Sequence, residues 1–87
     1  MPNLRFAALK EQRVAVITGG ARGIGRACAL RIAEEGRNIV IADVEETSAE
    51  VVKEVEALGQ RALFVKTDVT DIAAVKSMVA QTVETFG

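Results

Sequence analysis

The chain has 87 residues, of which 49% are hydrophobic, and its 11 basic and 12 acidic side chains give a formal net charge of -1. This composition suits one soluble unit with a modest core, and the dispersed, nearly balanced charge argues against nucleic acid or an anionic membrane as a partner. Because histidine is absent and Cys28 is the single cysteine, we expect no metal site, no internal disulfide, a small core role for Cys28 and a reducing cytoplasmic setting.

The chain is expected to open with an arm and to continue into short buried strands. Residues 1–13 carry charge and an apolar patch only at 6–9, which is shorter than the about 7 to 15 apolar residues of a secretory signal. Apolar runs at 14–17, 39–42 and 62–65 do not alternate with polar residues, which is typical of strands buried on both faces of a parallel sheet. No run approaches the about 20 apolar residues that span a bilayer.

A helical stretch follows each of these strands, and each stretch ends at a glycine. The first is expected to begin near Gly23 or Ile24. The glycines stand where a left-handed C-terminal cap would be placed, at Gly36, Gly59 and Gly87.

The second and third helices carry start signals and apolar faces. The second is expected to begin at a capping box formed by Thr47 and Glu50, and the third near Thr70 and Asp71. The apolar face of the second consists of Val51, Val55 and Leu58. The stripe of the third consists of Ile72, Val75, Val79, Val83 and Phe86. We expect both sets to pack in the core.

The order β-α-β-α-β-α predicts an α/β fold with a parallel sheet. Right-handed crossovers place the strands in the order 3-2-1, with the first two helices on one face and the third on the other, giving a Rossmann-type three-layer arrangement. No fourth strand follows to cover the edge at residues 14–17. We therefore interpret residues 1–87 as the N-terminal portion, the first half of a doubly wound dinucleotide-binding domain whose remainder is absent.

A glycine-rich loop, VITGGARGIGRA at residues 16–27, connects the first strand to the first helix. Glycines at Gly19, Gly23 and Gly25 would permit a positive φ at the turn, a close approach of backbone to a pyrophosphate, and tight packing of helix on strand. The unpaired N–H groups of the helix N-terminus would point into this loop. The loop is therefore a candidate phosphate-binding site.

Spacing separates the phosphate motifs that compete for this loop. A P-loop read from Gly20 and Gly25 would require Lys and then Ser or Thr, where the chain has Arg26 and Ala27. The common dinucleotide pattern G-x-G-x-x-G/A, read from Gly23, meets Cys28 at its last position.

The pattern that matches in full is T-G-x-x-x-G-x-G, read as Thr18, Gly19, Gly23 and Gly25. It resembles the cofactor-binding motif of the classical short-chain dehydrogenase/reductase family. Asp43 ends the second strand 24 positions after Gly19, where an acidic residue can accept a hydrogen bond from the adenosine ribose.

Further cofactor-binding positions follow from the glycine loop and from the resemblance. In the family, an Asp-Val pair such as Asp68 and Val69 after the third strand contacts the adenine. Ile24, at the start of the first helix, belongs to the candidate diphosphate site. Arg22 occupies a position where members that use NADP often carry a basic residue. Since Asp43 would repel a 2′-phosphate more strongly than an exposed Arg22 would attract it, we expect NAD rather than NADP.

The resemblance implies an oxidoreductase that acts on a small-molecule alcohol or ketone and associates as a homo-oligomer. It also implies a catalytic serine and a Tyr-x-x-x-Lys motif, and the chain contains no tyrosine, so we name no catalytic residue and expect this chain alone to be inactive. Two alternatives stay open: a non-catalytic module that binds an adenine nucleotide, and a methyltransferase that uses S-adenosylmethionine. The methyltransferase accounts less well for Thr18 and for the spacing from Gly19 to Gly25.

Overall fold

The computed structural model describes residues 13–87, so the expected arm lies outside the described residues except for its last position. The elements are β1 (Val14–Thr18), α2 (Gly23–Glu34), β2 (Asn38–Asp43), α3 (Ser48–Ala57), β3 (Ala62–Lys66) and α4 (Ile72–Phe86). Within residues 13–87, no helix is long and apolar enough to cross a membrane.

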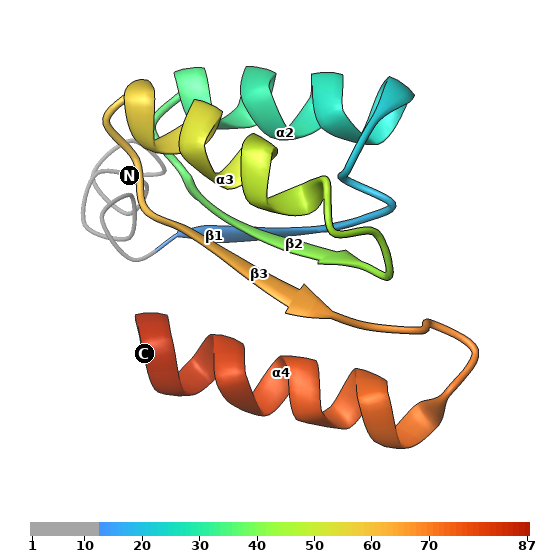
Figure 1. Ribbon diagram of the computed structural model, residues 1–87. Helices are drawn as coiled ribbons and strands as arrows, with labels where there is room; N and C mark the ends of the chain where they lie inside the picture. The colour runs from blue at the N-terminus through green and yellow to red at the C-terminus, as the bar shows by residue number, and fades with distance from the viewer. Residues whose placement is uncertain (1–12) are drawn as a thin grey trace, which may run out of the picture.

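The three strands form one parallel sheet in the order β1-β2-β3, which confirms the predicted topology. In its register, Ile17 pairs with Ile41, and Ile41 pairs with Phe64. Helices α2 and α3 cover one face of the sheet, and α4 lies on the other (Figure 1). All three strands therefore end at the same edge.

The core is divided by β2 into two halves, one on each face of the sheet. Ile39 and Ile41 pack with the buried residues of α2 and α3, whereas Val40 and Ala42 pack with Met78 of α4. This alternation explains why the second apolar run is buried on both faces. Strand β1 departs from that expectation, because Val16 at the edge of the sheet is 42% exposed.

Helix α2 presents small residues to the sheet, and Cys28 is not among them. Ala29 and Ala33, one helical turn apart, are buried against the strands. Cys28 precedes Ala29 by one position, and a helix rotates by about 100° per residue, so its thiol is exposed on the outer side. The expected core role for Cys28 is therefore wrong.

The capping box expected at the start of α3 does not form. Thr47 has helical dihedral angles, φ -61° and ψ -13°, and its side chain makes no capping hydrogen bond. An N-cap side chain reaches the first turn from extended backbone, so the helical backbone of Thr47 turns the hydroxyl away. The hydroxyl instead donates to Glu45 Oε2 at 3.4 Å. Leu58, expected in the core, lies beyond the end of α3 and is 44% exposed.

Helix α4 begins as expected, and its apolar stripe is only partly buried. Asp71 is its N-cap, and Asp71 Oδ1 accepts from the backbone N–H groups of Ala73 at 2.9 Å and Ala74 at 3.3 Å. Met78 is buried, and Val75 and Phe86 are half-buried. The rest of the expected stripe is exposed: Ile72, Val79 and Val83. Among residues 13–87, no fourth strand lies beyond β1 to cover that part of the helix.

All three helices are followed by a glycine with positive φ, as predicted. The angles are 94° at Gly36, 91° at Gly59 and 82° at Gly87. These left-handed residues end each helix and turn the chain.

Candidate functional site

The loops that follow the three strands form one groove of about 320 Å³ at the carboxyl edge of the sheet. It is lined by Thr18, Gly19, Ala42, Asp43, Val44, Thr67, Asp68 and Val69. Five of these are predicted site residues from three separate segments, and the parallel register brings them together. Beyond the strand ends, Gly19 N donates to Ala42 O at 3.1 Å and Thr67 N donates to Asp43 O at 2.9 Å.

The glycine loop needs glycine for two distinct reasons. Gly19 and Gly23 have φ angles of 67° and 62°, a backbone conformation that residues other than glycine rarely adopt. Gly25 is required by space, because a Cβ built there would lie 2.0 Å from the carbonyl oxygen of Gly19. The helix thus packs directly on the backbone of the loop.

The N-terminus of α2 is suited to an anion. Its N-cap residue, Arg22, makes no side-chain hydrogen bond to the first turn, and that turn carries no acidic residue. Backbone N–H groups at such a terminus lack helical partners and favour negative charge. Ile24 is 84% exposed beside them. This end of α2 therefore differs from that of α4, where the Asp71 carboxylate occupies the first turn.

Asp43 connects the glycine loop to the turn between β2 and α3. Its Oδ2 accepts from Ala21 N at 3.1 Å, and its Oδ1 accepts from Val44 N at 2.7 Å and Glu45 N at 3.1 Å. A carboxylate offers about four lone-pair positions, so one remains on Oδ2 for a hydroxyl donor. The side chain is half-buried at the groove, where it can accept that bond.

Asp68 is held by the turn that precedes α4. Its Oδ1 accepts from Thr70 Oγ1 at 2.6 Å and Thr70 N at 2.9 Å, and these bonds lower the pKa of the Asp68 carboxyl below its ordinary value. Because Asp71 caps α4, Asp68 is not needed for that purpose. Val69, next to it, is 56% exposed at the groove.

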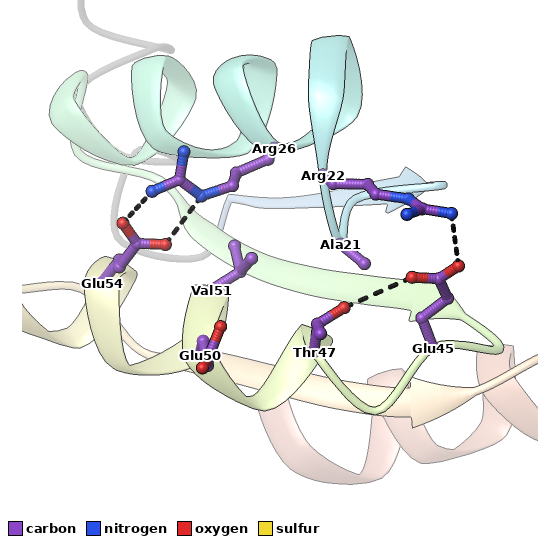
Figure 2. Close-up of a pocket in the computed structure, with 8 residues that line it drawn as sticks. All are labelled: Ala21, Arg22, Arg26, Glu45, Thr47, Glu50, Val51 and Glu54. Carbon is purple, nitrogen blue, oxygen red and sulfur yellow. Dashed lines mark hydrogen bonds and ion pairs between the residues drawn. The ribbon is translucent and has the colours of Figure 1, made fainter.

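Arg22 belongs to a different groove, which lies between α2 and α3. Its guanidinium donates to Glu45 Oε1 at 2.7 Å, and farther along the groove Arg26 forms two hydrogen bonds to Glu54 (Figure 2). The groove measures about 480 Å³ and is lined by Ala21, Arg22, Arg26, Glu45, Thr47, Glu50, Val51 and Glu54. Arg26 thus pairs with a carboxylate across the two helices, and Arg22 pairs with one in the turn that precedes α3.

Sequence reasoning missed the roles of Ala21 and Glu45. Ala21 acts through its backbone N–H, which leaves no signature in the side chain, and Glu45 is one of several glutamates in a polar stretch. The described part of the chain contains no cluster of three or more His, Cys, Asp or Glu placed to hold a metal ion.

Comparison with known proteins identifies the family. The family model for short chain dehydrogenases matches residues 13–87. The chain is 51% identical over 76 residues to 2,5-dichloro-2,5-cyclohexadiene-1,4-diol dehydrogenase of Sphingobium indicum, which covers 86% of this chain and 30% of that protein. It is 49% identical over 80 residues to an uncharacterized oxidoreductase of Thermotoga maritima, with 88% and 30% covered.

Solved structures give the same result. The crystal structure of carveol dehydrogenase from Mycobacterium avium in complex with NAD superposes with a TM-score of 0.81 at 36% identity, covering 86% of this chain and 32% of that one. The chain spans about 30% of the length of the curated relatives described above. The match over residues 13–87, together with these similarities, confirms the resemblance inferred from the motifs: the chain belongs to the short-chain dehydrogenase family.

Proposed function

We propose that this chain is the cofactor-binding segment of a longer NAD-dependent dehydrogenase that acts on an alcohol or carbonyl group of a small molecule. The observation that carries the proposal is the groove in which the ends of three strands meet beside the open N-terminus of α2. Relatives named for diol and hydroxycyclohexanecarboxylate substrates support the alcohol class. The resemblance extends the proposal to a cytoplasmic homo-oligomer.

Residues of the groove and of the start of α2 would each bind a different part of the cofactor. The diphosphate would lie against the N–H groups at the start of α2, with Gly23, Ile24 and Gly25 around it and Thr18 and Gly19 at the preceding turn. The adenosine ribose would donate to Asp43, and the adenine would contact the Asp68 carboxylate and the backbone at Val69. When bound, the nicotinamide supplies hydride exchange with the substrate.

The charge at Asp43 favours NAD over NADP. A 2′-phosphate about 5 Å from this carboxylate would be repelled by roughly 3 kcal/mol per unit charge at an effective dielectric constant near 20, and by less in salt. A free 2′-hydroxyl would instead donate to the remaining lone pair of Oδ2. We therefore propose a preference for NAD.

Titration calorimetry tests the proposal, because it measures the heat of cofactor binding directly. The protein is prepared as the longest natural polypeptide that contains this sequence and titrated with NAD and with NADP. We expect both to bind and NAD to bind more tightly. Tighter binding of NADP would contradict the preference, and a lack of any binding would contradict the proposed function.

A further inference from the structure

We propose that Glu45 is a specificity residue that keeps Arg22 from binding a 2′-phosphate on the adenosine ribose. The proposal rests on the function proposed above, in which the ribose lies at Asp43. It concerns a contact between two loops that the sequence motifs do not include.

Glu45 holds Arg22 by a short ion pair. The distance from Arg22 Nη2 to Glu45 Oε1 is 2.7 Å, and Glu45 Oε2 accepts from Thr47 Oγ1 at 3.4 Å. Figure 2 shows this chain of contacts among the residues that line the groove between α2 and α3. Both carboxylate oxygens are thus engaged, and the guanidinium is directed toward the turn between β2 and α3.

Asp43 places this ion pair next to the proposed ribose position. Its carboxylate accepts from the N–H of Ala21, the residue before Arg22, and from the N–H of Glu45 itself. The group that would bind the ribose therefore fixes both backbone segments that carry the pair. A phosphate on the 2′-oxygen would enter the space beside Arg22 and Glu45.

The pair contributes little to the stability of the fold, so its effect on ligand binding is the consequence of interest. The side chains are 79% and 35% exposed, and ion pairs exposed to this degree add little to stability. A free guanidinium, however, presents a fork of donors that fits a phosphate bidentately. By pairing with Nη2 of that fork, Glu45 neutralises the cation that would otherwise offset the charge of Asp43.

Affinities for NAD and NADP, measured by calorimetry on the same natural polypeptide, test the proposal. Glu45→Gln should tighten NADP binding roughly three- to tenfold, with NAD affinity changed by less than about twofold, since one exposed charged contact is gained. Glu46→Gln is the matched control, because it removes the same charge from a neighbouring side chain that is 81% exposed and pairs with Lys66 instead. It should leave the ratio of the two affinities unchanged.

The double variant Arg22→Gln/Glu45→Gln identifies the mechanism. If Glu45 acts by holding Arg22, the gain in NADP affinity disappears when Arg22 is also replaced. A gain that persists would mean that Glu45 acts by its own charge, which overturns the proposal, as does an unchanged ratio in folded Glu45→Gln protein. Failure of the unsubstituted protein to bind NAD contradicts the proposed function instead. Circular dichroism verifies that each variant is folded.

Discussion

Gly19 and Gly25 should respond differently to the same substitution. Gly19→Ala introduces strain at a left-handed residue with open space around it and should cost about 1 to 2 kcal/mol. Gly25→Ala forces a methyl group onto the loop backbone and should cost roughly 3 kcal/mol or more. Urea unfolding gives both values. Gly19→Asn should be milder than Gly19→Ala because asparagine tolerates this conformation; equal costs at Gly19 and Gly25 would contradict the distinction.

Asp43→Asn should weaken NAD binding by roughly ten- to hundredfold, the value of a hydrogen bond to a charged acceptor. The amide also loses an acceptor for the backbone N–H groups that Asp43 now binds, so stability should fall as well. Calorimetry and thermal unfolding separate the two effects. Glu46→Gln, which removes a charge outside the groove, serves as the control, and an equal loss there would argue for a nonspecific charge effect.

At this scale, local patterns could be predicted and long-range contacts could not. The glycine positions and Asp43 follow from spacing, because a strand, a turn and a helix start are determined by neighbours in sequence. The bond from Arg22 to Glu45 joins residues 23 positions apart and depends on how Asp43 ties two loops together. The exposure of Cys28 depends on which side of α2 faces the sheet. Small residues occur on several sides of this helix, so the sequence pattern did not indicate that side.

The starts of α3 and α4 provide a matched pair of cap substitutions. Asp71→Ala removes two hydrogen bonds to the first turn of α4 and should cost about 1 kcal/mol of unfolding free energy. Thr47→Ala should cost only a few tenths, because Thr47 makes no capping bond. Chemical denaturation measures both. If Thr47→Ala lowered the unfolding free energy as much as Asp71→Ala, the result would indicate that Thr47 does form a capping box.

Thr70 should control the titration of Asp68. The hydroxyl bond from Thr70 is the largest cause of the lowered pKa of Asp68, so Thr70→Val should raise that pKa while the backbone bond remains. A lowered pKa stabilises the folded state above the unfolded pKa, and this contribution is lost as pH falls through the folded value. NMR titration of the carboxyl measures the shift. An unchanged pKa in Thr70→Val would exclude the hydroxyl as its cause.

Helix ends were easier to predict than helix starts. A glycine after an apolar periodic segment has few alternatives to ending the helix, and all three did so. The spacing of Thr47 and Glu50 fits a capping box equally well whether the backbone at Thr47 is extended or helical. The structure has the helical form, so the pattern was necessary but insufficient.

The described molecule leaves apolar surface uncovered on β1 and α4, which should promote association. Val16, Val79 and Val83 are exposed to 42%, 51% and 60%. The 87-residue chain should therefore show an apparent mass above 9.3 kDa that grows with concentration in light scattering. Val79→Gln with Val83→Gln should reduce this growth, whereas Ala57→Gln on the exposed surface of α3 should not. A concentration-independent mass of 9.3 kDa for the unsubstituted chain would contradict the expectation.

The sheet order and the division of helices between faces could be predicted, because handedness leaves few topologies for alternating strands and helices. Burial of the α4 stripe could not be predicted. A helical apolar pattern indicates which side of the helix is apolar, but not whether the described residues pack against that side. Family membership favours the oxidoreductase over the methyltransferase alternative. The catalytic residues that the resemblance implies have no counterpart in this sequence.

The three hydrogen bonds of Asp43 have a thermodynamic consequence for ligand capture. Oδ2 binds the loop after β1 through Ala21 N, and Oδ1 binds the turn after β2 through Val44 N and Glu45 N. Ordering loops during binding normally reduces affinity, so bonds that restrict both segments would let a ligand retain more of its contact energy. Asp43 would thus contribute to affinity in two ways. It would accept a hydrogen bond from the ribose, and it would lower the entropy cost of ordering the two segments on binding.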